Sequence, residues 1–108
     1  GHLTGKYLAD PAAPGRLTQW PAFGQRYGKP NVVPAVTAYA ALAKKHGLTL
    51  TQLALGFARS RWFVSSTIIG ASSLAQLRET LPATRTPIDT ELLAEIDAIH
   101  LRYTNPAP

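Results

Sequence analysis

Residues 64–80 read Val64-Ser-Ser-Thr-Ile-Ile-Gly-Ala-Ser-Ser-Leu-Ala-Gln-Leu-Arg-Glu-Thr80, and this stretch decides the predicted fold. Its apolar and β-branched start predicts a short strand over 64–69, which Gly70 ends in a tight turn. Ser73 and Gln76 form a capping-box pattern, so a helix is expected to follow. A strand, a glycine turn and a helix N-terminus direct backbone N–H groups at one point, which favours a bound anion.

Composition limits the class of protein. The chain has 108 residues, no cysteine and a formal net charge of +5. This length suffices for one modest core, and the lack of cysteine excludes a disulfide framework or a cysteine–histidine zinc site and fits a cytoplasmic protein. No apolar run approaches the roughly 20 residues that span a bilayer. The basic residues are scattered, which favours a mildly basic surface, with one or two cations facing a phosphate as the alternative.

Local patterns around this stretch predict mainly helices. Apolar spacing and capping signals predict helices at about 32–46, 50–60, 74–81 and 90–103. Gly47 is expected to end the first helix, Thr49 and Asp89 to cap the second and the last, and Pro82 to stop the third. Residues 8–31 are rich in proline and glycine and are expected to form a long irregular loop.

The predicted strand has no predicted partner in this chain. A lone strand leaves two rows of backbone donors and acceptors unpaired, so its partners are expected to lie in sequence before Gly1. The chain also does not begin with Met. We therefore expect a fragment of a longer protein.

Two glycine turns are candidates for ligand contact. Thr4-Gly5-Lys6 offers a hydroxyl, a permissive backbone and a point charge, and 70–73 offers backbone donors, hydroxyls and a helix start. In a (β/α)8 barrel, phosphates bind at the loops after the last two strands. If 64–69 is the last strand, both turns lie on that face. The alternatives are a purely structural turn at Gly70, with its serines acting only as caps, and an ordinary surface lysine at Lys6.

Several spaced motifs carry a resemblance to a known family. The chain is similar to the C-terminal third of an aldo/keto reductase, most of all to the bacterial Tas-type proteins and the potassium-channel β-subunit branch. The motifs lie in colinear order at 1–7, 48–55, 64–72, 76–79 and 93–99, followed by Tyr103. The resemblance implies an α/β fold, the C-terminal part of a (β/α)8 TIM barrel. Residues 1–108 would be one piece of a single domain, with a cofactor-side loop at 1–31 and the last strand and helices at 32–108.

The resemblance also implies a cofactor, NADP(H), and the residues that hold it. Gly5 and Lys6 would lie along the phosphates, and Arg16 would act as a clasp. The 2′-phosphate end would be wrapped by Gly70, Ala71 and Ser72, and the adenine and ribose approached by Gln76 and Glu79. Thr80 stands where the family pattern has asparagine, which changes the expected adenine contact.

The family reduces aldehydes and ketones by hydride transfer, with a tyrosine, a lysine, a histidine and an aspartate as catalytic groups. None of these four matches a position here, so no catalytic residue is assigned and the fragment alone is expected to be inactive. The implied partner is a small carbonyl substrate, with no nucleic acid and no membrane. A non-catalytic NADP(H)-sensing or regulatory subunit is the alternative. A small basic DNA-binding domain, with a helix-turn-helix over 51–68, is the remote one.

Overall fold

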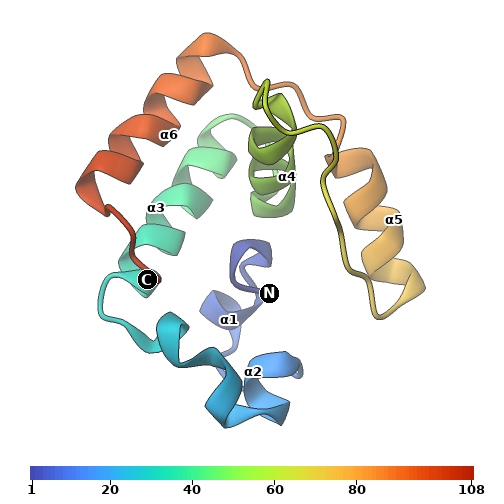
Figure 1. Ribbon diagram of the computed structural model, residues 1–108, viewed down its shortest axis with the longest axis vertical. Helices are drawn as coiled ribbons and strands as arrows, with labels where there is room; N and C mark the ends of the chain where they lie inside the picture. The colour runs from blue at the N-terminus through green and yellow to red at the C-terminus, as the bar shows by residue number, and fades with distance from the viewer.

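The computed structural model describes the backbone of residues 1–108 and every side chain except that of Pro21. Regular structure in this part of the chain is helical, in the order η1 (His2–Thr4), α1 (Lys6–Ala9), α2 (Arg16–Gln19), η2 (Pro21–Gly28), α3 (Val32–Lys45), α4 (Leu50–Ser60), α5 (Leu74–Ala83) and α6 (Thr90–Arg102). Figure 1 shows α6, α3, α4 and α5 arranged as an arc, with the N-terminus inside it and α2 below.

The strand predicted at 64–69 is not formed, and the α/β fold class predicted for the chain is therefore wrong. The described residues contain no strand, and the segment between α4 and α5 runs without regular structure (Figure 1). Ile68 is 97% exposed and Trp62 is 92% exposed. A strand needs a neighbour for its backbone groups, and the described residues contain no other strand that could supply one. The apolar pattern alone does not create a sheet.

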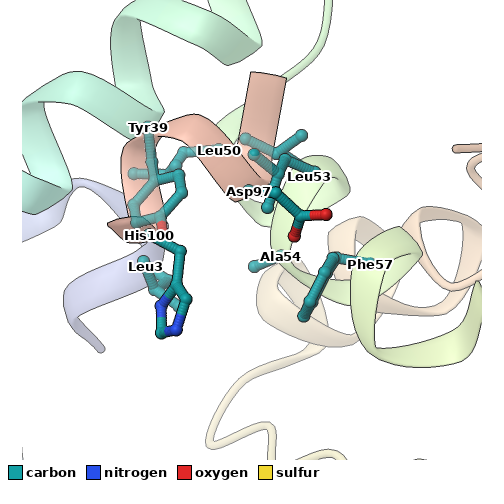
Figure 2. Close-up of a pocket in the computed structure, with 9 residues that line it drawn as sticks. Leu3, Tyr39, Leu50, Leu53, Ala54, Phe57, Asp97 and His100 are labelled. Atoms are coloured by element: carbon teal, nitrogen blue, oxygen red, sulfur yellow. The ribbon is translucent and has the colours of Figure 1, made fainter. Parts of the chain in front are cut away.

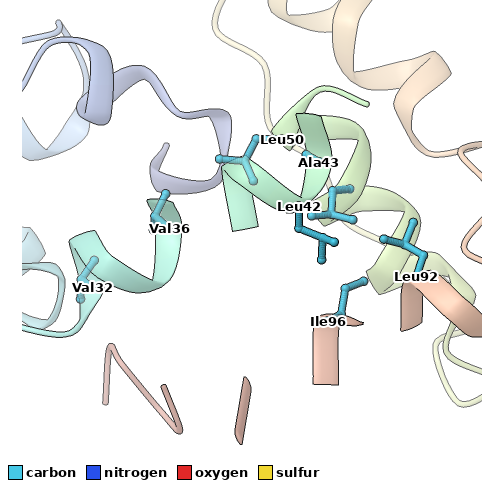
Figure 3. Packing of buried hydrophobic residues seen from close by; sticks show 8 residues of the cluster. Val32, Val36, Leu42, Ala43, Leu50, Leu92 and Ile96 are labelled. Atoms are coloured by element: carbon cyan, nitrogen blue, oxygen red, sulfur yellow. The ribbon is translucent and has the colours of Figure 1, made fainter. Parts of the chain in front are cut away.

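The core lies where α3, α4 and α6 meet. Apolar residues at helical spacing on each of the three helices form one cluster, made of Val32, Val36, Leu42, Ala43, Leu50, Leu53, Leu92 and Ile96 (Figure 3). The sequence predicts these helices because its apolar residues recur on one face of each. Their packing fixes the scaffold from which the other elements extend.

The predicted caps at Thr49 and Asp89 and the predicted helix end at Gly47 are confirmed. Thr49 and Gln52 form both hydrogen bonds of a capping box. The Gln52 amide donates to Thr49 Oγ1 at 3.1 Å, and the Thr49 amide donates to Gln52 Oε1 at 2.8 Å. Asp89 Oδ1 accepts a bond from the Leu92 amide at 2.8 Å. Gly47 adopts a φ of +67° after α3, the left-handed conformation that favours glycine at a helix end. These signals act within a few residues and need no partner from elsewhere.

The long irregular loop predicted at 8–31 is only partly correct. It contains the helical turns α2 and η2, and the helix α1 begins just before it. The Gly15 carbonyl oxygen accepts backbone hydrogen bonds at the start of α2, and the Gly15 amide donates to the Thr18 hydroxyl oxygen at 3.0 Å. The helix that Pro82 was expected to stop after Leu81 instead includes Pro82 and ends at Ala83. The fixed φ of proline is compatible with a helical turn, so Pro82 does not end the helix at the preceding residue.

A surface ion pair joins α3 to α6. The Glu95 carboxylate accepts a bond from Lys45 Nζ at 2.6 Å and contacts His46 Nε2 at 2.8 Å. The bridging role of Glu95 depends on the packing of two segments about fifty residues apart in the sequence. The bonds from Lys45 and His46 hold the pKa of Glu95 below its usual range, and the bond to Glu95 raises the pKa of Lys45.

None of the helices in the described part of the chain combines the length and hydropathy needed to cross a membrane.

Replacing Gly56 by alanine tests the close approach of α4 to the connector before α6. A Cβ at this position would lie 2.8 Å from the Thr86 carbonyl oxygen and 3.1 Å from Ile88 Cδ1. Alanine is the better helix former, but backbone at that distance has to move. We expect Gly56→Ala to destabilise the chain by about 1–3 kcal/mol in urea unfolding. Gly28→Ala, where a Cβ meets nothing within 4 Å, is the matched control.

The Glu95 bridge predicts a pH-dependent stability. Its pKa is lower in the folded than in the unfolded chain, so its contribution is present above the unfolded value and is lost as pH falls through the folded one. We expect Glu95→Gln to lower the melting temperature at pH 7 and the difference from the unsubstituted chain to be smaller at pH 3. An equal difference at both pH values, measured by circular dichroism, would contradict the bridge.

Candidate functional site

The first group of predicted site residues converges at the start of α1 and α2. Gly5 has a φ of +78° and links η1 to α1. Lys6 begins α1, and its Nζ donates to the Pro14 carbonyl at 3.0 Å. Gly15 precedes Arg16, and a Cβ on Gly15 would collide with Lys6 Nζ and with the Tyr7 hydroxyl. Glycine at position 15 therefore lets the Lys6 ammonium pack against the backbone beside Arg16.

Aromatic rings hold these two cations in place. The Lys6 ammonium lies 4.8 Å from the centre of the Tyr7 ring, and the Arg16 guanidinium lies 5.0 Å from that of Phe23. Neither cation forms an ion pair in the described part of the chain, where both salt bridges involve Glu95. Two positive groups without acidic partners are suited to an anionic ligand.

The second group lies at the start of α5. Ser73 Oγ accepts the Gln76 amide at 3.2 Å, which confirms Ser73 as the helix cap. The Gln76 side chain does not complete the capping box, because its Oε1 accepts from the amide and hydroxyl of Ser72 at 2.9 and 3.1 Å. The Thr80 hydroxyl donates to the Gln76 carbonyl within the helix. The amide and hydroxyl of Ser72 are thus already hydrogen-bonded within the chain. To bind a ligand, they would have to leave Gln76 Oε1.

The remaining predicted residues of this group are exposed to solvent. Gly70 and Ala71 are exposed, and a Cβ on Gly70 would meet nothing within 4 Å. Gly70 is not among the positive-φ residues, so the predicted glycine turn has no conformational need for glycine here. Glu79 is exposed on α5.

The structure does not bring the two groups together. In Figure 1 the start of α5 lies well apart from α1 and α2. Lys6 and Arg16 form one cluster, and Ser72, Ser73 and Gln76 form another. A site that used both would need a different placement of α5 relative to the N-terminal turns.

A pocket that the sequence did not indicate opens between η1, α3, α4 and α6. It has a volume of about 330 Å³, and its lining comprises Leu3, Tyr39, Leu50, Leu53, Ala54, Phe57, Ile96, Asp97 and His100 (Figure 2). The lining is mainly apolar, with polar groups from three residues. These residues come from four separate elements, so no local sequence signal could have found the pocket.

The polar groups of this pocket include a tyrosine, an aspartate and a histidine, three of the four types that the catalytic set needs. Burial, and then the Asp97 carboxylate, raise the pKa of Tyr39. A tyrosine that donates a proton near neutral pH needs the opposite shift, from a neighbouring cation. No lysine lines the pocket. The chemistry of Tyr39 therefore does not fit a catalytic acid.

The helix-turn-helix alternative lacks its second helix. Residues 50–60 form α4, but 64–70 contain no helix, so no recognition helix follows the turn.

Comparison with known proteins identifies the family. The model of the aldo/keto reductase family matches residues 1–101. The chain therefore belongs to the aldo/keto reductase family, which confirms the resemblance inferred from the sequence motifs.

The relatives include the Tas type that the motifs indicate. The chain is 43% identical over 110 residues to Protein tas of Escherichia coli, covering 100% of this chain and 31% of the relative. It is 37% identical to an aldo-keto reductase of Babesia bovis, over 98% of this chain and 39% of the relative. It is 31% identical to L-galactose dehydrogenase of Arabidopsis thaliana, over 88% of this chain and 31% of the relative. The chain thus spans about a third of the length of these relatives.

The environment of Tyr39 is testable by titration. Its pKa is raised above the usual value of 10.0, first by burial and then by Asp97. We expect an NMR titration to show a tyrosine step above pH 10.0 that vanishes in Tyr39→Phe. The same step should move only part of the way back towards 10.0 in Asp97→Asn, because burial remains. The Tyr103→Phe variant is the control and should leave that step in place.

Proposed function

We propose that this chain is the NADP(H)-binding C-terminal part of an aldo/keto reductase that reduces aldehydes or ketones to alcohols. Membership of an oxidoreductase family supports the reaction class. The observation that carries the cofactor proposal is the convergence of Lys6 and Arg16 beside Gly15, without acidic partners in the described residues.

The N-terminal cluster suits the phosphates of a dinucleotide. Gly5 already has the left-handed backbone that allows a close approach. Lys6 supplies a compact charge and Arg16 a planar fork that can bind phosphate with two parallel bonds. We place Gly5 and Lys6 along the cofactor phosphates, with Arg16 as the clasp.

The serine turn before α5 suits the 2′-phosphate. Ser72 offers an amide and a hydroxyl that now share one acceptor, Gln76 Oε1. A phosphate oxygen would be a stronger acceptor than an amide oxygen, because hydrogen bonds to charged groups are the stronger ones. In this proposal Gly70, Ala71 and Ser72 turn towards the 2′-phosphate, and Gln76, Glu79 and Thr80 approach the adenosine.

The chemistry itself belongs to residues outside this chain. A bound nicotinamide would supply the hydride, and Tyr39, the tyrosine of the pocket, does not have the environment of a proton donor. The longer parent protein would supply the catalytic groups and the pocket for a small carbonyl substrate. Its cytoplasmic location stays a prediction from the cysteine-free sequence.

Paired cofactor titrations of the parent protein test these placements. Loss of a charge-assisted bond costs about 1.5–3 kcal/mol, or about 10- to 100-fold in Kd. We expect Ser72→Ala to weaken the binding of NADPH by about that factor. The binding of NADH should change little, because only NADPH carries the 2′-phosphate. Lys6→Ala should weaken both. Quenching of tryptophan fluorescence by each cofactor gives the Kd values.

Two control variants separate ligand contact from structure. Ser73→Ala removes the α5 cap and should affect NADPH and NADH alike. Lys44→Ala removes an exposed lysine of α3 and should change neither. Equal losses of NADPH and NADH in Ser72→Ala would refute its placement at the 2′-phosphate.

A further inference from the structure

The His2 ring lies against two tyrosine rings that belong to different elements. The centres of the His2 and Tyr27 rings are 4.4 Å apart and the rings are stacked at an angle of 26°, whereas those of His2 and Tyr7 are 5.2 Å apart. His2 Nε2 is buried and has no hydrogen-bond partner among the described residues. Ring packing therefore fixes the imidazole, and it joins η1 to both α1 and η2.

The contact with Tyr27 attaches η2 to the start of the chain. Where the structure describes the chain, no backbone hydrogen bond joins η2 to η1 or α1. η2 packs closely on α2 instead, because a Cβ on Gly24 would collide with the Leu17 side chain. α2 and η2 thus form one packed unit, and the ring of His2 links that unit to η1.

The same unit meets α1 at a second point. The backbone at Gly15 lies so close to α1 that a Cβ there would collide with Lys6 Nζ and with the Tyr7 hydroxyl. Tyr7 is also the second ring against His2. The contacts therefore form a closed circuit that runs from η1 through α1, α2 and η2 and returns to η1.

This circuit carries the two cations that lack an acidic partner in the described residues. Lys6 belongs to α1, and its Nζ donates to the Pro14 carbonyl at 3.0 Å. Arg16 begins α2, and its guanidinium lies 5.0 Å from the centre of the Phe23 ring of η2. The charged groups of a binding site need neighbours that hold them in place. The position of Arg16 relative to Lys6 depends on how α2 and η2 are held against α1.

We propose that His2 is a positioning residue for the cofactor: packed against Tyr7 and Tyr27, it holds α2 and η2 against α1 and keeps Arg16 beside Lys6. This inference rests on the proposed function, which places Lys6 and Arg16 at the cofactor phosphates. His2 acts through Arg16 and not by touching the cofactor. Its removal therefore lets the Arg16 clasp open, which shortens the time for which the cofactor stays bound.

The rate of NADPH release from the parent protein tests this role. Stopped-flow fluorescence of bound NADPH, with excess NADP⁺ as a trap, gives that rate. We expect His2→Ala and Tyr27→Ala each to speed release by about 2- to 10-fold, the factor that one aromatic pair contributes. The double variant should be little faster than His2→Ala, because both substitutions remove the same contact. His2→Phe keeps a ring and should restore slow release.

Two further variants separate positioning from general stability. His46→Ala removes an imidazole that contacts Glu95 on the other side of the core. It should lower the melting temperature and leave NADPH release unchanged. His2→Ala made in an Arg16→Ala background should have little further effect on release, because the stacked rings act through Arg16.

Unchanged release in His2→Ala and Tyr27→Ala would overturn the inference. It would also fall if His2→Phe were as fast as His2→Ala, or if His46→Ala sped release equally. Should His2→Ala fail to fold, Tyr27→Ala tests the same contact from a side chain that is already 37% exposed. A parent that binds NADPH but shows none of these changes refutes only the role of His2. A parent that binds no NADPH refutes the proposed function and, with it, this inference.

Discussion

The packing of α3 against α4 and α6 is the interaction on which the rest of the structure depends. Leu42, Leu53 and Ile96 bring apolar side chains from all three helices into one cluster. At about 25 cal/mol per Å² of buried apolar surface, such contacts are the main stabilising term for a chain this small. The Glu95 bridge adds a surface contact on one side of this cluster, and the pocket remains on the other.

The sequence predicts the helices well because their signals are local. Thr49 and Asp89 cap helices through bonds to amides three residues away, and the Gly47 conformation depends on its own backbone. A strand at 64–69 depends on a partner far along the chain, and without one these residues are irregular, and none of them is buried. An apolar, β-branched pattern shows that a segment is able to form a strand, but hydrogen bonding to a neighbouring strand decides whether it does.

The same distinction separates the predicted site residues from the pocket. Glycine, lysine and serine at 5, 6 and 72 are visible as turn and capping signals, and the structure retains the cap at Ser73. Tyr39 on α3 meets Asp97 and His100 on α6 only because these two helices pack, so no spacing in the sequence marks the three residues together. The effect of Asp97 on the pKa of Tyr39 likewise follows from the packing of the two helices.

Charge distinguishes the two groups of predicted site residues. Lys6 and Arg16 lie against aromatic rings, and neither cation has an acidic partner in the described residues. An anionic ligand would therefore neutralise charges that the described residues leave unpaired. At the start of α5, the amide and hydroxyl of Ser72 are already hydrogen-bonded to Gln76 Oε1, so a ligand there has to replace an existing acceptor. A phosphate oxygen can do so because hydrogen bonds to charged groups are the stronger ones.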